Sequence, residues 1–158
     1  MEKKRTILLG YGQCLQFGAK SPALSDKTLQ LLLKDSLVTT LDNCIDIKPD
    51  HVIDVGQEKW PFKDATIDVI VDHVGFCPFY CWTLHFWEQV LRVLKMGGSY
   101  VTKNVHSIGF SLAKSAKLVD GEGFVEYLHV HEYKTGDRLV KVVKKKKEQK
   151  ENVVSHPR

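Results

Sequence analysis

Short apolar runs that alternate with amphipathic helical patterns are the feature that most constrains how this chain can fold. Five runs have the length and the apolar or β-branched content of buried strands, at residues 7–9, 37–41, 51–53, 67–71 and 99–102. Helical patterns separate the first run from the second and the fourth from the fifth. Strands that alternate with helices predict a mostly parallel sheet covered on both faces, which is an α/β architecture.

The helical patterns have recognisable ends. In the first, Ser25 can cap a helix that carries three leucines on one side, Leu29, Leu32 and Leu33. In the second, apolar residues recur at helical spacing over residues 86–94. Gly97 and Gly98 follow, and we expect them to end this helix because glycine tolerates a positive φ. A weaker helical pattern covers residues 106–118.

The C-terminal part has a different pattern. Residues 124–132, and again residues 139–143, divide into two alternating sets with the two-residue period of a strand, on either side of a turn at 134–137. This pattern predicts an antiparallel β-hairpin. The polar residues 149–158 are expected to fray. We therefore predict one domain over residues 1–148, followed by a flexible tail over 149–158.

The charge of the chain is mildly positive, with a formal net charge of +4. Much of the excess is a basic edge between Lys141 and Lys150, which includes the lysine run at 144–147. This edge can contact the phosphates of a nucleic acid, or a protein partner. The alternative is a solvated strand end, which needs no partner.

No apolar stretch approaches the roughly 20 residues that a membrane-spanning helix requires. The charged N-terminus is followed only by a short apolar run, at residues 6–9, which is too short for a signal peptide. We therefore expect an intracellular, cytoplasmic protein without a membrane span and with reduced thiols. Cys77 and Cys81 are four positions apart, but their pattern falls short of a zinc site, and no metal is predicted.

Four motifs follow one another in the segment from Thr39 to Gly98. They are residues 39–42 (TTLD), 49–54 (PDHVID), 60–70 (WPFKDATIDVI) and 88–98 (EQVLRVLKMGG). In order and spacing they resemble the class I S-adenosylmethionine-dependent methyltransferases. The resemblance implies a Rossmann-like three-layer sandwich, with a mostly parallel seven-stranded sheet and a C-terminal antiparallel hairpin. It also implies S-adenosyl-L-methionine as the cofactor and a methyl acceptor that the sequence does not identify.

Two acidic residues are implied as cofactor ligands by this resemblance. Asp42 ends the second strand, where its two oxygens suit the two hydroxyls of a ribose. Asp54 ends the third strand and matches a family position near the adenine. The residues that follow them, Asn43 and Val55, are included in the predicted cofactor site. The alternative for both acids is a role in capping the next turn. Asp46 takes the place of Asp42 if the register slips.

The glycine loop departs from the family pattern. Gly10-Tyr11-Gly12 is present and is predicted to bind the cofactor, because glycine lets the backbone approach a ligand closely. The family carries an acidic residue two positions before the first glycine, where this chain has Leu8. Its third glycine is replaced by Cys14. These two departures concern the part of the site that would meet the methionine end of the cofactor.

The predicted catalytic residues follow the fourth strand. Asp72 and His73 stand where a general base is useful, and Asp72 is also included among the cofactor ligands. Methyl transfer itself needs alignment more than acid–base help, because the donor is already activated. The segment 76–80 echoes a substrate motif of amino-group methyltransferases only faintly, and aromatic packing is the alternative for it.

Two functions remain open at this point. The first is an active S-adenosylmethionine-dependent methyltransferase, which the four motifs favour. The second is a degenerate domain of the same fold that serves as a structural or protein-interaction module, which Leu8 and Cys14 favour. A nicotinamide-dependent enzyme fits less well, because the glycine loop does not continue as Gly-x-Gly-x-x-Gly.

Overall fold

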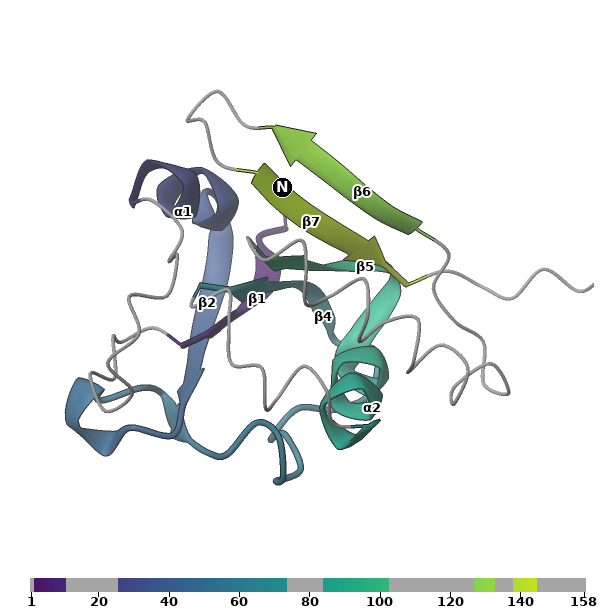
Figure 1. Ribbon diagram of the computed structural model, residues 1–158. Helices are drawn as coiled ribbons and strands as arrows, with labels where there is room; N and C mark the ends of the chain where they lie inside the picture. Colours follow the sequence, from purple (N-terminus) through teal and green to yellow (C-terminus); the bar gives the residue numbers. More distant parts are fainter. Residues whose placement is uncertain (1, 11–25, 74–83, 103–126, 133–137, 145–158) are drawn as a thin grey trace, which may run out of the picture.

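The computed structural model describes residues 2–10, 26–73, 84–102, 127–132 and 138–144, and the strands among them form one seven-stranded sheet (Figure 1). The strands are β1 (Lys4–Leu9), β2 (Ser36–Asp42), β3 (His51–Val52), β4 (Ile67–Asp72), β5 (Leu94–Thr102), β6 (Tyr127–Glu132) and β7 (Arg138–Val143). The helices are α1 (Asp26–Leu33), α2 (Leu84–Val93) and a short 3-10 turn, η2 (Ile45–Ile47).

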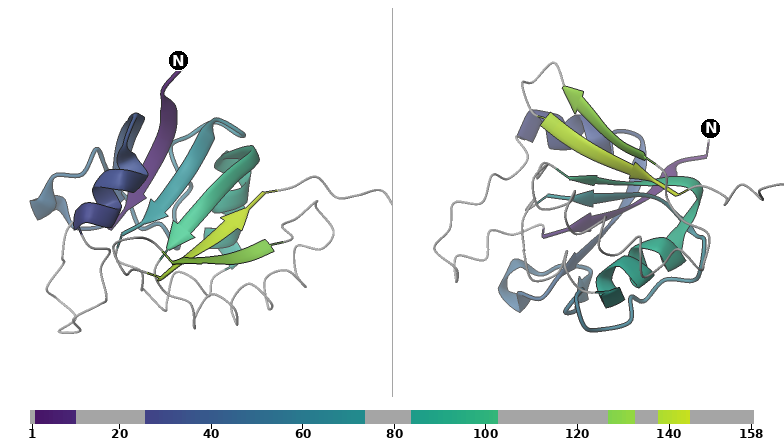
Figure 2. Two further views of the ribbon diagram at one scale, coloured as in Figure 1. Left: turned by 90° about the horizontal axis from the view of Figure 1, so that it is seen from above. Right: turned by 45° about the vertical axis from the view of Figure 1, so that its right-hand side comes forward.

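The order of the strands is β3-β2-β1-β4-β5-β7-β6. Strands β1 to β5 pair in parallel, and the left view of Figure 2 shows the arrowheads of β1, β4 and β5 at one edge of the sheet. Strand β7 runs antiparallel to both of its neighbours, β5 and β6. The 3-2-1-4-5 order is that of a doubly wound sheet, with an antiparallel strand added between β5 and β6. The expected mostly parallel α/β sheet with a C-terminal antiparallel pair is confirmed.

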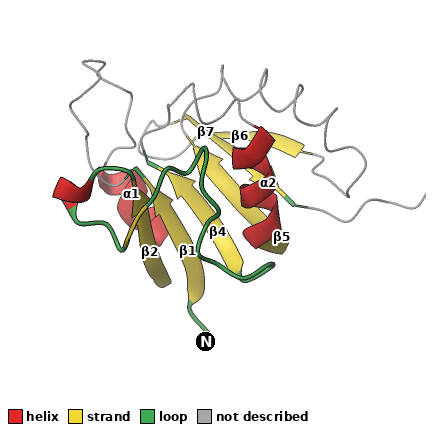
Figure 3. Cartoon of the chain, turned by 90° about the horizontal axis from the view of Figure 1, so that it is seen from below, coloured by secondary structure: helices red, strands yellow, loops and turns green. Residues whose placement is uncertain are grey.

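The two helices lie on opposite faces of the sheet, α2 in front of it and α1 behind it in Figure 3. Alternate residues of β1 enter different cores: Ile7 and Leu9 join the one beneath α2, and Leu8 joins the one beneath α1. All three are at most 4% exposed. A strand buried on both faces has no polar side, which is why residues 7–9 form an unbroken apolar run.

The end of α2 differs from the sequence prediction. We expected Gly97 and Gly98 to end the helix, but α2 ends at Val93 and β5 begins at Leu94, which already pairs with Ile67. The last carbonyls of the helix find other donors. The amides of Ala65 and Thr66 donate to Arg92 O and Val93 O at 2.8 and 2.9 Å. The glycine pair therefore lies inside a strand, beside an irregularity in the β4–β5 register.

Several predictions fall on residues outside the described ranges. They include the helix expected at 106–118, the turn at 134–137 and the tail at 149–158. Within the described residues, no helix has the length and apolar character needed to cross a membrane.

Candidate functional site

The carboxyl ends of β1 to β4 gather most of the predicted site residues at one edge of the sheet. Leu9 of β1 pairs with Leu41 of β2 on one side and with Asp72 of β4 on the other. The strand order reverses between β1 and β4, and open α/β sheets bind their ligands beyond the carboxyl ends of the strands at such a reversal point. Gly10, Asp42 and Asp72 thus stand on three adjacent strands around one point.

Gly10 is the first residue of the predicted glycine loop, and the structure shows why it is glycine. Its φ is +66°, in the region that residues with a Cβ rarely adopt. Its amide donates to Leu41 O at 3.1 Å, which extends the ladder between β1 and β2 by one bond. The chain therefore turns sharply at the tip of β1. The next two residues of the predicted site, Tyr11 and Gly12, lie outside the described residues.

Asp42 is the last residue of β2, and its side chain is only 7% exposed. Its Oδ1 accepts the amide of Cys44 at 2.8 Å, and its backbone carbonyl accepts the amide of Ile53 at 2.9 Å. Asp42 therefore caps the turn that follows β2, which is the alternative role predicted for it. This role occupies one carboxylate oxygen, while Oδ2 has no partner among the described residues. Asn43, which follows, is exposed.

Asp54 also organises a turn. Its Oδ1 accepts the amide of Gly56 at 2.9 Å, and its own amide donates to Glu58 Oε1 at 2.7 Å. The Glu58 amide donates back to Asp54 O at 2.8 Å, and together these bonds fix the loop that follows β3. Val55 is partly buried against the core, and its carbonyl accepts the indole N–H of Trp60 at 3.0 Å. Its side chain therefore has a packing role in the described structure.

Asp50 fastens the start of β3 to the end of β2. Its Oδ2 accepts the amide and the hydroxyl of Thr40 at 2.7 and 2.9 Å, and its amide donates to the same hydroxyl oxygen at 2.8 Å. The bond from the Thr40 amide, and then that from its hydroxyl, lower the pKa of the Asp50 carboxyl below the ordinary 3.8. These contacts hold the strand ends that carry Asp42 and Asp54.

The Asp50 contacts give a pH-dependent contribution to stability. A carboxyl whose pKa is lowered by folding stabilises the protein above its unfolded pKa, and this contribution is lost as the pH falls through the folded pKa. We expect Asp50→Asn to lower the free energy of unfolding at pH 7 by less than about 1 kcal/mol, because the site is exposed. Urea titrations should show the difference between the two proteins shrink as the pH falls below the ordinary pKa of 3.8 and vanish below the lowered pKa of the folded protein. A difference that grows in acid would contradict this assignment.

Asp72 ends β4 and has a partner that the sequence patterns did not reveal. Its Oδ2 accepts the hydroxyl of Tyr100 at 2.6 Å, and the exposures of the two residues are 8% and 0%. Tyr100 comes from β5 and makes edge-to-face contacts with Phe86 and Trp87, at ring-centroid distances of 6.0 and 5.3 Å. An aromatic cluster under α2 thus aims a phenol at the predicted catalytic carboxylate.

His73 is half-buried and continues the line of β4. Its amide donates to Leu9 O at 3.0 Å, so its backbone is tied to the tip of β1. This bond keeps Asp72 and His73 at the reversal point of the sheet. Segment 76–80 and the cysteines Cys77 and Cys81 lie outside the described residues. Among the residues described, no group of three or more His, Cys, Asp or Glu side chains is placed to hold a metal ion.

No family model and no curated protein matches the sequence, whereas solved structures do. A TehB-like SAM-dependent methyltransferase from Corynebacterium glutamicum matches with a TM-score of 0.56 and 16% identity, over 92% of this chain and 82% of that one. The 16S rRNA methyltransferase RsmC of T. thermophilus, in complex with AdoMet and guanosine, matches with a TM-score of 0.50 and 17% identity, over 91% of this chain and 36% of that one. The chain has the fold of SAM-dependent methyltransferases.

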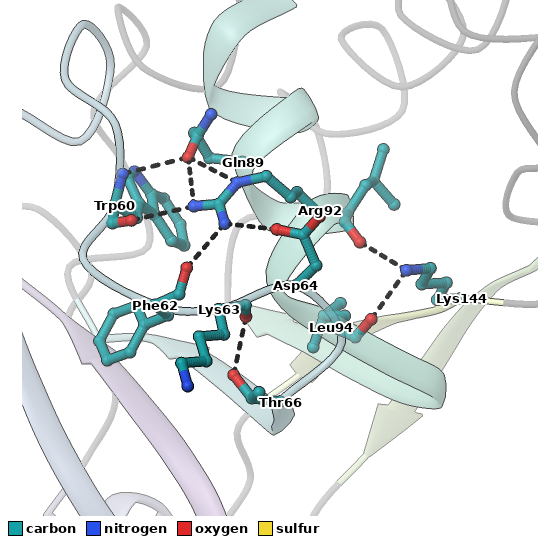
Figure 4. A network of polar contacts seen from close by, with 10 residues as sticks. Trp60, Phe62, Lys63, Asp64, Thr66, Gln89, Arg92, Leu94 and Lys144 are labelled. Carbon is teal, nitrogen blue, oxygen red and sulfur yellow. Dashed lines mark hydrogen bonds and ion pairs between the residues drawn. The ribbon is translucent and has the colours of Figure 1, made fainter.

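Within this methyltransferase fold, Arg92 explains why two of the four motifs occur together. Its guanidinium donates to Trp60 O, Phe62 O and Asp64 Oδ1 at 2.9, 2.7 and 2.8 Å (Figure 4). Gln89 Oε1 accepts from the same group and from the amide of Trp60, at 2.8 and 3.1 Å. The arginine of the last motif therefore clamps the loop formed by the WPFKD motif onto α2.

One lysine of the predicted basic edge, Lys144, has a structural role. The ammonium of Lys144 donates to Leu91 O and Leu94 O at 2.7 and 2.8 Å, beyond the end of α2 (Figure 4). Burial lowers the pKa of this lysine, and the nearby Asp64 opposes that effect. Lys144 therefore serves as a helix cap and does not present its charge to a phosphate. Lys141 is half-buried, and the lysines from 145 to 150 lie outside the described residues.

Proposed function

We propose that this chain binds S-adenosylmethionine across the carboxyl ends of β3, β2, β1 and β4 and transfers its methyl group to an acceptor. The observation that carries the proposal is the set of three acids, Asp42, Asp54 and Asp72, that follow three strands of this fold at one edge of the sheet. Carboxylate oxygens can accept hydrogen bonds from the hydroxyls of a ribose and from the amine of an adenine, and a carboxylate can also attract a sulfonium. When bound, this cofactor supplies a methyl group that is already activated for transfer.

The described residues fit the nucleoside half of the cofactor. The positive φ of Gly10 lets the backbone turn away and leaves room for a ligand at the tip of β1. Asp42 keeps one oxygen for a ribose hydroxyl while the other holds its loop. Asp54 and the adjoining Asn43 and Val55 complete the adenine side of the proposed site. Tyr11 and Gly12 are proposed to continue it past Gly10.

The proposed catalytic residues act at the other end of the site. Asp72 and His73 lie where β4 ends, so an acceptor that approaches there meets a carboxylate and an imidazole. The carboxylate can orient a protic acceptor by accepting its hydrogen bond, and the imidazole can take the proton that methylation releases. The basic edge from Lys141 to Lys150 is proposed to contact a nucleic acid or protein partner through its lysines other than Lys144.

Asp42→Asn tests the cofactor site. The amide retains an oxygen for the Cys44 N–H but presents a donor in place of Oδ2, which cannot accept from a ribose hydroxyl. Isothermal titration of the whole chain should show S-adenosylmethionine bound about tenfold more weakly, a loss of about 1.4 kcal/mol.

Asp46→Asn is the matched control for this experiment. Asp46 is exposed, lies four residues further along in η2 and occupies the alternative register. We expect its replacement to leave binding unchanged. A loss of affinity in Asp46→Asn, with none in Asp42→Asn, would assign the ribose to the other register. Failure of the unaltered chain to bind at millimolar cofactor would reject the proposal.

Leu8 favours a second candidate function. It is 1% exposed and packs in the core beneath α1, so the position that carries an acid in the resembled family supplies no carboxylate here. A chain that has lost this group can persist as a structural or protein-interaction module of the same fold. Co-purification of a stable partner, together with an absence of cofactor binding, would select this function over the first.

A further inference from the structure

The strand order fixes which part of the cofactor faces Asp72, provided that the proposed function holds. The order is β3-β2-β1-β4, with Asp54 after β3, Asp42 at the end of β2 and Asp72 at the end of β4. If the adenine lies by Asp54 and the ribose by Asp42, the remaining part of the molecule must continue past β1 towards β4. In that arrangement the sulfur of the cofactor would lie nearer to Asp72 than to Asp42 or Asp54.

The Asp72 carboxylate is built into the protein in one orientation. Its Oδ2 is held by the Tyr100 hydroxyl at 2.6 Å, and Tyr100 is fully buried against Phe86 and Trp87. Its backbone is fixed by pairing with Leu9. A carboxylate that is 8% exposed is weakly screened by water, so its interaction with a nearby charge is stronger than at the surface.

Methyl transfer changes the charge at the position that this carboxylate faces. The bond between sulfur and the methyl carbon breaks with both electrons left on sulfur, and the carbon bonds to the acceptor. The sulfonium thereby becomes the neutral thioether of S-adenosylhomocysteine. Adenine, ribose and amino acid are the same in both molecules, so the charge on sulfur is the main feature by which a fixed site can distinguish them.

The geometry points to Asp72 as the residue whose carboxylate attracts the sulfonium more strongly than the neutral thioether, with Tyr100 as its positioning residue. The pair gives the site a preference for the cationic cofactor over the neutral product, which favours release of the product after each turnover. Asp42 and Asp54, the other carboxylates of the site, face parts that both molecules share and do not discriminate between them.

The test compares three ligands that differ in charge at one position. They are S-adenosylmethionine, S-adenosylhomocysteine and sinefungin, in which a carbon that carries a protonated amine replaces the methylated sulfur. Isothermal titration of the whole chain should show that Asp72→Asn weakens the two cationic ligands about tenfold and changes the neutral one by less than twofold. Tyr100→Phe, which removes the hydroxyl but keeps the ring, should cause the same change in selectivity to a smaller extent, about threefold.

Asp42→Asn is the control, because it should weaken all three ligands by one common factor. If Asp72→Asn or Tyr100→Phe also weakens all three equally, these residues only support the structure and the inference is overturned, while the proposed function stands. If the unaltered chain binds none of the three ligands, the proposed function falls and the inference falls with it. Thermal melts of each variant separate loss of folding from loss of selectivity, and Tyr100→Phe keeps the aromatic contacts if Asp72→Asn fails to fold.

Discussion

Replacing Arg92 with alanine is expected to lower the free energy of unfolding by about 3 kcal/mol. The Arg92 side chain is 19% exposed, and its guanidinium donates to the carbonyls of Trp60 and Phe62 at 2.9 and 2.7 Å, as well as to Gln89 and Asp64. Removing it leaves polar atoms without donors and releases the loop that carries Trp60, which is 1% exposed in the core. Urea denaturation followed by tryptophan fluorescence measures the loss.

Two further variants separate the geometry of this contact from its charge. Arg92→Lys keeps a cation but cannot reach two carbonyls and two side chains with a planar fork, so we expect it to recover less than half of the loss. Asp64→Ala removes the ion pair on its exposed side, where the carboxylate is 77% exposed, and should cost less than about 1 kcal/mol. If Asp64→Ala were as damaging as Arg92→Ala, the ion pair and not the carbonyl clamp would hold the loop.

Gly98→Ala is expected to cost about 2–3 kcal/mol, although it adds a single methyl group. A Cβ at this position would lie 2.9 Å from Lys95 O, 3.1 Å from Asp68 O and 3.2 Å from Ile67 O. All three atoms belong to the backbone of paired strands, so none can move aside without breaking the register between β4 and β5. The midpoint of thermal unfolding should fall accordingly.

Gly97 is the natural comparison, because its constraint is of a different kind. Nothing lies within 4 Å of a Cβ built on it, but its φ is +79°. We expect Gly97→Ala to cost about 1 kcal/mol and Gly97→Asn to cost less, because asparagine tolerates that conformation. A larger loss for Gly97→Ala than for Gly98→Ala would show that backbone conformation, and not close approach, requires this glycine pair.

The strands could be predicted from the sequence because the burial of a strand determines which of its residues are apolar. Residues 7–9 are buried on both faces and form an unbroken apolar run, and the β-branched residues of 139–143, which follow a turn signal at 134–137, predicted β7. The end of α2 was predicted wrongly for a physical reason. A glycine is favoured after a helix when a residue with positive φ is needed to satisfy the last carbonyls of that helix. Here Lys144 and the amides of Ala65 and Thr66, from distant parts of the chain, donate to those carbonyls instead.

The site was predictable only as far as it depends on strand ends. Asp42 and Asp72 could be placed at the edge of the sheet because each follows an apolar run. Tyr100 could not be paired with Asp72 from the sequence, because the contact joins residues 28 positions apart and depends on the β4–β5 register. Its only signal was a tyrosine within the short strand predicted at residues 99–102. The structure shows that Asp42 and Asp54 cap turns, whereas their contacts with a cofactor stay predictions.

The central pair of strands has a consequence for how the chain reaches its native state. Strand β1 pairs with β4, and the Arg5 amide donates to Asp68, 63 positions away, so the middle of the sheet joins segments that are synthesised far apart. Parallel pairing over such distances in sequence is slow, because the entropy of closing a long loop must be overcome before the contacts form. We therefore expect the pairing of β1 with β4, and the ligand site proposed at their carboxyl ends, to be completed late in folding. A ligand that binds there recognises only fully folded molecules, and it should slow the unfolding of the protein as well as raise its melting temperature.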